Sequence, residues 1–379
     1  MLMNISQQIW PRRKFIINVA GMGAATMLHP LLLSNDHQGD PRVNEIVSKT
    51  IGIDTHNHID VPLNAAELPG PGVDLAGDMK KSGLSAICMT FAVDYQKLTK
   101  AGEAYERFTN GLNAMDEVLK NNQMKRSLNL ADLEDAHKKH QPTVIQSVEG
   151  GHFLEGKLDR LDIAYGLGLR QLGLLHDSDA TVPLGDVYTN PAQWGGLTSF
   201  GVDTIRECNK LGILVDLTHC SNETINAALK VTGEPVIISH TGLDTQLGQN
   251  EAMAKMMRPR LISKEQAKIV AGAGGVIGVW THLSDSPLEY AQNIRAMTDV
   301  IGVDHVCIGT DTKMTPSYNP RGNPPRPGER TNDAWQNQKV GFYYAVVAAL
   351  LKTGFTEDEI GKIGGGNFLR IFQAATAGH

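Results

Sequence analysis

Short apolar runs rich in β-branched residues alternate with longer amphipathic stretches from about residue 50 to the end of the chain. Strands that are apolar almost throughout are typical of a parallel sheet covered on both faces. Each run is separated from the next by enough residues to form a helix. The pattern predicts eight strands, at residues 50–56, 84–92, 143–149, 169–175, 212–219, 235–240, 274–281 and 305–311.

Several intervals between these strands carry helix start and stop signals. Ser221 is placed as an N-cap, Ser263 with Gln266 has the spacing of a capping box, and Gly212 ends a helical stretch. Eight strands that alternate with helices favour an α/β fold of the (β/α)8 TIM barrel type, with a doubly wound open sheet as the alternative. The predicted helices lie within residues 73–83, 198–212, 221–233 and 263–275.

The first residues read as a targeting segment rather than as part of this fold. An Arg12-Arg13 pair and Phe15 precede an apolar stretch rich in Gly and Ala, and the polar "SNDHQGD" follows. This resembles a bacterial twin-arginine signal, so we expect a signal segment at 1–35 and one (β/α)8 domain at 45–379. The mature protein would then be periplasmic or secreted, exported by the twin-arginine machinery. A basic helix of a cytosolic protein and a retained N-terminal anchor are the alternatives.

Composition narrows the possible partners. The formal net charge of −6 gives no basic footprint, which argues against a nucleic-acid partner. No later stretch is long and apolar enough to predict a transmembrane helix in the mature chain. The four cysteines lie far apart in the sequence, and we expect buried free thiols rather than a disulfide framework.

Side chains that can bind a metal stand at the C-terminal ends of six of the eight predicted strands. In a barrel these ends meet on one face, where active sites are built. Each residue alone has an ordinary structural explanation, such as a hydrogen-bonded loop histidine, an exposed loop carboxylate or a turn cap. The residues are His56, His58, Glu149, His176, His219, His240 and Asp311.

The joint pattern favours a metal site. Side chains alternate along a strand, so His56 and His58 point the same way and can hold one ion together. By the same alternation, we expect Asp54 to share their face one step deeper in the barrel. Imidazole nitrogens and a carboxylate suit zinc, so His56 and His58 would hold one ion, His219 and His240 a second, and Glu149 both.

Two zinc ions per chain predict hydrolysis. Paired metals lower the pKa of a shared water and polarise the carbonyl that it attacks. Asp311 would accept the proton and return it to the leaving amine. Arg260 could hold a substrate carboxylate by a bidentate bond, with Arg258 as the nearby competitor.

Seven motifs together resemble the membrane (renal) dipeptidase family, peptidase family M19, which are zinc peptidases of the amidohydrolase superfamily. The resemblance covers about residues 45–375. The motifs stand in the family's order: "SVEGGH", "LGLRQLGLLH", "DLTHCSNETINAAL", "PVIISHT", "RPRLISKEQ", "IGTD" and "GFTEDEIGKIGGGNFLRIF".

The resemblance implies a binuclear zinc barrel that hydrolyses dipeptides, tolerates D-residues at the C-terminal side and pairs as a homodimer. It implies that His176 contacts the scissile carbonyl region, Arg260 the substrate carboxylate, and Asp311 the amino group or the shuttled proton. The implied metal ligands are His56, His58, Glu149, His219 and His240, with Glu149 bridging.

The chain departs from the family's pattern at the first strand. The family has His-x-Asp there, whereas this chain has His56-Asn57-His58, and "PRLIS" lacks an asparagine that often follows the family's arginine. A neutral imidazole in place of a carboxylate raises the charge of the metal site by one unit. Another small amide, a lactone or an ester is therefore the alternative substrate. A catalytically silent metal-binding barrel is the second alternative, since a fold alone does not fix function.

Overall fold

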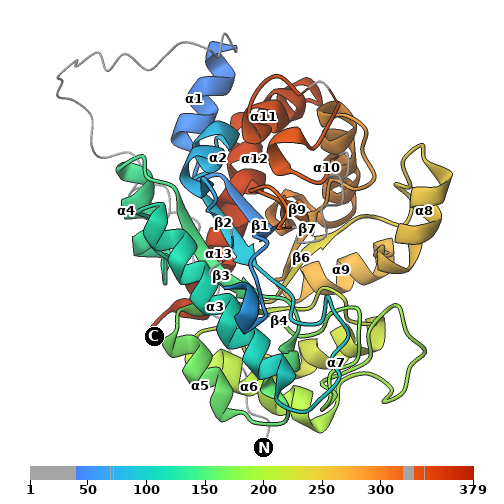
Figure 1. Cartoon of the computed structure of the whole chain (residues 1–379). Coiled ribbons are helices and arrows are strands. Elements are labelled where there is room, and N and C mark those ends of the chain that lie inside the picture. The colour runs from blue at the N-terminus through green and yellow to red at the C-terminus, as the bar shows by residue number, and fades with distance from the viewer. Residues whose placement is uncertain (1–39, 69, 71, 319–327, 337) are drawn as a thin grey trace, which may run out of the picture. The chain divides into compact units, whose positions relative to one another are not determined.

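The computed structural model describes residues 40–68, 70, 72–318, 328–336 and 338–379, and residues 39–379 form one compact unit. The predicted signal segment lies outside the described residues. All strands belong to one parallel sheet in the order β8-β7-β6-β5-β4-β3-β2-β1-β9 (Figure 1). The strands are β1 Ile53–His58, β2 Ala86–Thr90, β3 Thr143–Val148, β4 Leu169–Gly173, β5 Leu214–Asp216, β6 Ile237–Thr241, β7 Val276–Val279, β8 Val306–Ile308 and β9 Thr312–Lys313.

The two ends of this sheet meet. β8 pairs with β7, and β9, which follows β8 after three residues, pairs with β1 through His58 and Lys313. Between β8 and β9, the N–H of Asp311 donates to the carbonyl oxygen of His56 at 3.1 Å. β8 and β9 thus act as two parts of one interrupted strand that closes the barrel. The predicted (β/α)8 fold is confirmed, and each of the eight predicted strands is present.

Helices surround the strands (Figure 1). Gly212 ends α6 in the left-handed region at φ 78°, and Ser221 caps α7, as the sequence predicts. The predicted capping box is only half formed, because Ser263 accepts from the Gln266 N–H while the Gln266 amide donates to Asn226. The helices are α1 Pro41–Lys49, α2 Leu75–Ser82, α3 Glu103–Asn121, α4 Leu130–Lys138, α5 Asp159–Gly166, α6 Ser199–Leu211, α7 Asn222–Val231, α8 Glu251–Met257, α9 Lys264–Gly272, α10 Pro287–Ile301, α11 Phe342–Lys352, α12 Glu357–Gly361 and α13 Asn367–Thr376.

Apolar side chains fill the barrel at the N-terminal ends of its strands. Phe368 and Phe372 of α13 stack on each other with ring centroids 5.5 Å apart and join this layer. This apolar layer closes the barrel interior at the N-terminal ends of the strands. Polar side chains gather at the C-terminal ends, as in other (β/α)8 barrels. The strand residues of the layer are Ile53, Ala86, Cys88, Ile145, Leu214, Ile237, Val276 and Cys307.

A β-bulge in β1 decides which side chains face the barrel interior. The pairing with β2 advances three residues in β1, from Asp54 to Asn57, while β2 advances two. Such an extra residue reverses the alternation of the side chains beyond it. The expectation that Asp54 shares the face of the two histidines is therefore wrong. The Asp54 carboxylate instead accepts hydrogen bonds from Asn57 and Thr310, away from the histidines' side of the strand.

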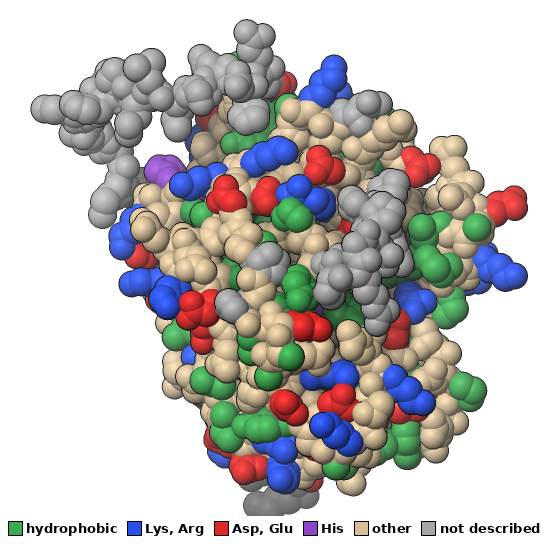
Figure 2. Space-filling view, in the orientation of Figure 1, with side chains coloured by type: hydrophobic (Ala, Val, Ile, Leu, Met, Phe, Trp, Pro, Cys, Tyr) green, Lys and Arg blue, Asp and Glu red, His purple; other side chains and the backbone are tan. Residues whose placement is uncertain are grey.

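The surface charges and the state of the cysteines match what the composition predicts. Lys, Arg, Asp and Glu side chains are interspersed over the face seen in Figure 2. All four cysteines are buried and free, as expected. Within the described part of the chain, no helix has both the length and the apolar character needed to cross a membrane.

Candidate metal centre

Glu149 lies at the centre of the predicted site, just after β3, with its residue only 3% exposed. Its Oε1 atom lies 2.8 Å from His219 Nε2, 3.4 Å from His56 Nε2 and 3.7 Å from His240 Nε2. Its Oε2 atom lies 3.7 Å from His58 Nε2. One carboxylate thus contacts histidines that come from β1, from the end of β5 and from β6, which is the position that a bridging ligand requires.

The two histidines of β1 point into the barrel together. Their Nε2 atoms lie 3.2 Å apart, and His58 Nε2 lies 3.1 Å from Asp311 Oδ1. Two ring nitrogens at this distance repel each other unless a proton or a cation lies between them. The potential ligand atoms of His56, His58 and Asp311 all lie within 4.8 Å of one another, so this group could hold a metal ion.

The outer nitrogens of His56 and His240 are held by one hydroxyl. Ser239 Oγ lies 3.2 Å from His56 Nδ1 and 3.1 Å from His240 Nδ1. Thr218 Oγ1 contacts the same hydroxyl at 3.2 Å and donates to Asp216. Because the Nδ1 atoms are engaged, both rings direct Nε2 toward Glu149, as metal-binding histidines do.

The backbone also orients two of the predicted site residues. His219 follows β5 with φ 67° and Asp311 follows β8 with φ 55°, both in the left-handed region. A residue other than glycine in this region costs of order 1–3 kcal/mol, and such residues cluster at functional sites. Because both positions lie at strand ends facing Glu149, the strained backbone helps to direct their side chains into the barrel.

The pKa values of the residues around Glu149 are shifted by burial and by neighbouring charges. Burial holds the pKa of His56 well below its ordinary value and also lowers that of His240, so burial favours the neutral form of both rings. Burial raises the pKa of Glu149, but the nearby His176 and the hydrogen bond from His219 outweigh it and hold that pKa well below its usual range. Burial lowers the pKa of His219, yet hydrogen bonds with Asp177 and Glu149 raise it to about 10, so a metal ion must displace the proton on Nε2 to bind there.

The residues present fit a metal ion. Glu149 Oε2 is buried and has no hydrogen-bond partner among the residues that the structure describes. A buried carboxylate oxygen without a partner costs free energy, and a cation would remove that cost. Imidazole nitrogens with carboxylate oxygens form the donor set that zinc takes in hydrolases.

His176 lies beside the predicted ligands, and a hydrogen bond to Asp94 holds its ring in place. Its Nδ1 atom lies 2.6 Å from Asp94 Oδ1, while its Nε2 atom lies 3.4 Å from Glu149 Oε2. The Asp94 carboxylate can only accept a hydrogen bond, so it makes Nδ1 the donor and leaves Nε2 facing the cavity. His176 can therefore present Nε2 to a bound substrate.

Arg260 lies beside the centre, on the same cavity as His58 of β1. It lines a cavity of about 320 Å³ that is also lined by Glu149, His176 and His219. Its Nη2 atom lies 2.5 Å from Asp177 Oδ2. Arg258, the competing candidate, is exposed and does not occur among the described residues that line this cavity.

The structure brings further residues to the site that the sequence pattern leaves out. The predicted strands at 84–92 and 274–281 had no candidate site residue at their C-terminal ends. In the structure, polar or aromatic side chains stand at both ends. Asp94 and Tyr95 follow β2, and Trp280 and His282 follow β7, with His282 Nε2 2.8 Å from Asp311 Oδ2. The strand-end position was the signal that could have identified them. Asp177, which directly follows His176, lies 3.1 Å from His219 Nδ1.

Comparison with known sequences gives one family match. The sequence profile of the family described as membrane dipeptidase (peptidase family M19) matches residues 41–378. This range includes every predicted site residue and nearly all of the described chain.

Comparison with solved structures gives the same architecture. An amidohydrolase from Pseudomonas aeruginosa superposes with a TM-score of 0.69 at 21% identity, covering 88% of this chain and 98% of that chain. A protein described as a probable dipeptidase from the same species gives 0.70 at 16%, with coverage of 88% and 98%. A metallopeptidase from Rhodobacter sphaeroides, solved with a phosphinate mimic of the dipeptide L-Ala-D-Ala, gives 0.65 at 18%, with coverage of 86% and 99%. At these identities the likeness establishes a shared fold.

Proposed function

We propose that this chain, which belongs to the membrane dipeptidase family of the amidohydrolase superfamily, works with two zinc ions that Glu149 would bridge. Membership of this family makes the chain a metal-dependent dipeptidase. The observation that carries this proposal is the position of the Glu149 carboxylate. It lies between the β1 histidines on one side and His219 and His240 on the other, and its Oε2 atom has no hydrogen-bond partner in the described structure.

The proposed ligands divide into two sets. His56 and His58 would hold one ion, His219 and His240 would hold the other, and Glu149 would contact both. When bound, such a pair of ions lowers the pKa of a shared water toward neutrality and polarises the carbonyl group that the water attacks. The proximity of Asp311 Oδ1 to His58 Nε2, at 3.1 Å, places a further carboxylate beside the first ion's ligands.

Asp311 is proposed to move the proton. Burial raises its pKa, but His240 and hydrogen bonds with His282 and His58 outweigh burial and hold the pKa well below the usual range. The carboxylate is therefore ionised and has an oxygen that can accept a proton from the attacking water, although its low pKa makes it a weak base. It then returns this proton to the nitrogen of the leaving amine, which completes the hydrolysis.

His176 and Arg260 are proposed to position the dipeptide. His176 would contact the scissile carbonyl oxygen through Nε2, while Asp94 accepts a hydrogen bond from Nδ1. Arg260 would hold the C-terminal carboxylate with the guanidinium N–H groups that Asp177 does not occupy. The two ends of the substrate are then fixed on opposite sides of the metal centre, with Asp311 near the amino end.

The test combines metal content with a substrate panel. Purified protein loaded with zinc is expected to contain two ions per chain and to release amino acids from L,L- and L,D-dipeptides, including L-Ala-D-Ala. Asp311→Asn is expected to abolish turnover, whereas Asp299→Asn on the exposed face of α10 leaves it unchanged. Full activity of Asp311→Asn would remove Asp311 from the mechanism, and a single bound ion would overturn the bridged pair.

Export and assembly follow from the same reading of the sequence. We propose a twin-arginine signal at 1–35, a (β/α)8 metallohydrolase domain at 45–379, a periplasmic or secreted location and a homodimer. The Arg12-Arg13 pair supports the twin-arginine signal, and the family resemblance supports the homodimer. Replacing both arginines by lysine should keep the protein in the cytoplasm, and light scattering on the purified chain tests the dimer.

A further inference from the structure

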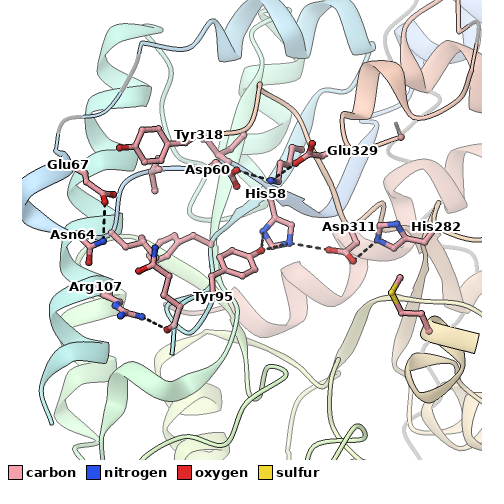
Figure 3. Close-up of a pocket in the computed structure, with 18 of the residues that line it drawn as sticks. His58, Asp60, Asn64, Glu67, Tyr95, Arg107, His282, Asp311, Tyr318 and Glu329 are labelled. Atoms are coloured by element: carbon pink, nitrogen blue, oxygen red, sulfur yellow. Dashed lines mark hydrogen bonds and ion pairs between the residues drawn. The ribbon is translucent and has the colours of Figure 1, made fainter. Parts of the chain in front are cut away.

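The metal centre opens on one side into a larger pocket of about 560 Å³. His58, Tyr95, Met257 and Asp311 line both this pocket and the smaller cavity beside Arg260. The larger pocket extends from His58 and Asp311 past Tyr95 toward Asn64 and Glu67, as Figure 3 shows. Its described lining residues include His58 and Asp311 but not Arg260, although the carbonyl oxygen of Met256 in its wall accepts a hydrogen bond from Arg260 at 3.4 Å.

The walls of this pocket are mainly apolar. Met256 of α8 is 53% exposed, and hydrophobic side chains are visible near this helix in Figure 2. Methionine has three rotatable bonds and adapts its shape to different apolar partners, so a wall of methionines can close around side chains of several shapes. The apolar lining residues are Ile59, Val61, Leu63, Phe91, Met253, Met256 and Met257.

The cations in the pocket are already paired. Lys313 Nζ lies 2.8 Å from Asp60 Oδ2 and 2.7 Å from Glu329 Oε1. Arg107 donates to the carbonyl oxygen of Val93 at 2.8 Å and pairs with Glu103 at 2.6 Å. Because these cations are satisfied inside the protein, the pocket offers no strong partner for an anionic substrate group. Its apolar walls favour an uncharged one.

The two ends of the substrate decide which side chain enters the pocket. With the dipeptide carboxylate at Arg260 and the amino group near Asp311, the N-terminal residue lies at the mouth of the larger pocket. We propose that this pocket binds the side chain of the N-terminal residue and selects bulky apolar residues such as Leu, Met and Phe. This proposal rests on the proposed function and names the substrate class for that site.

The first experiment compares two dipeptide series on the zinc-loaded enzyme. In the series X-Gly, with X as Ala, Leu, Phe, Lys or Glu, kcat/KM for Leu-Gly and Phe-Gly should exceed that for Ala-Gly by about tenfold or more. In the reverse series Gly-X, the same side chains should change kcat/KM by less than about threefold. A larger effect in the Gly-X series, or a preference for Lys-Gly over Leu-Gly, would overturn the proposal.

Variants that fill the pocket give an independent measurement. Met253→Trp on α8 and Leu63→Trp on the opposite part of the wall should each lower kcat/KM for Phe-Gly by about tenfold while leaving Ala-Gly within about twofold. Lys255→Trp, on the same helix but exposed and on the face turned away from the three lining methionines, is the matched control. Equal losses on Phe-Gly and Ala-Gly with both pocket variants would contradict the assignment.

Binding separates this proposal from the proposed function. The rise in melting temperature that each dipeptide gives the zinc-loaded protein should follow the same order, with Phe-Gly above Ala-Gly. If no dipeptide is hydrolysed but this order holds, the hydrolytic function fails and the pocket assignment stands. If all X-Gly dipeptides are hydrolysed and bound equally well, the pocket assignment fails and the hydrolytic function stands.

Discussion

Arg260 and Asp177 form an ion pair, with Nη2 and Oδ2 2.5 Å apart, that joins the proposed substrate anchor to a proposed metal ligand. The other oxygen of Asp177 lies 3.1 Å from His219 Nδ1. The guanidinium has five N–H donors, so the pair leaves donors free for a substrate carboxylate while fixing the plane of the group. One carboxylate thereby orients both the anchor and a histidine of the metal centre.

The first prediction concerns this anchor. Arg260→Gln should raise KM for dipeptides about tenfold or more with a smaller change in kcat, because a charged, bidentate contact to the substrate is lost. The loss should appear with free dipeptides and not with dipeptide amides, which lack the carboxylate. Arg258→Gln, on an exposed side chain two residues away, serves as the control. If both substitutions act equally, the anchor is assigned to the wrong residue.

The second prediction concerns metal affinity. Asp177→Asn should weaken zinc binding about 10–100-fold, because an outer carboxylate holds a metal-binding histidine in position and raises its basicity. Competition with a chromophoric chelator measures this without any substrate. Asp179→Asn, in the same loop but hydrogen-bonded in the described structure to Asn190 and Gln193 instead of His219, should bind zinc as the wild type does. An unchanged affinity in Asp177→Asn would limit Asp177 to the ion pair with Arg260.

The third prediction concerns His282, which lies 2.8 Å from Asp311 Oδ2 through its Nε2 atom. His282→Gln should lower kcat about tenfold and leave zinc content at the wild-type value, since Asp311 loses a partner that orients it. A merely structural role would instead lower the melting temperature without a separate effect on kcat. Steady-state kinetics, elemental analysis and thermal unfolding together distinguish the two.

The fourth prediction concerns the residue that departs from the family's pattern. His58→Asp should keep two ions but raise the ratio of dipeptide to lactone turnover about tenfold, because the added carboxylate lowers the net charge at the first ion. Tyr105→Phe, at a tyrosine outside the described lining of both cavities, should leave that ratio unchanged. Identical substrate preferences in His58→Asp and wild type would show that this ligand does not set specificity.

The fifth prediction concerns the backbone beneath the metal centre. A Cβ atom at Gly309 would lie 1.7 Å from the carbonyl oxygen of Ser239, whose hydroxyl holds His56 and His240. Gly309→Ala should therefore destabilise the fold by about 2 kcal/mol or more and weaken zinc binding. Gly272→Ala at the end of α9, where a Cβ atom meets nothing within 4 Å, should leave both properties unchanged or slightly improved.

The alternation of apolar runs was sufficient to predict the barrel and its eight strands. It failed at β1, because a period of two cannot reveal the extra residue between Asp54 and Asn57 that reverses the alternation. It also missed β9, since a strand of two residues has no pattern of its own. The polar residues at the strand ends nevertheless came together, because the fold, rather than the local register, brings those ends to one face.

The orienting residues were harder to find than the proposed ligands. Asp177 and Asp94 act through contacts with residues 42 and 82 positions away in the sequence, His219 and His176 respectively. Such contacts depend on how loops fold over the barrel, which residue spacing does not encode. The positions of Asp94 and His282 after predicted strands without an assigned side chain were the available signal, although they did not reveal the partners of these residues.

The apolar layer at the N-terminal ends of the strands also has a consequence for how the chain folds. Ile53 of β1 and Phe372 of α13 lie in this layer although they are about 320 residues apart in the sequence. A nascent chain that has exposed only its first strands therefore lacks the aromatic fill and cannot finish its core. Folding of the barrel should be completed after synthesis, so removal of α13 should trap a collapsed, aggregation-prone intermediate rather than a smaller stable domain.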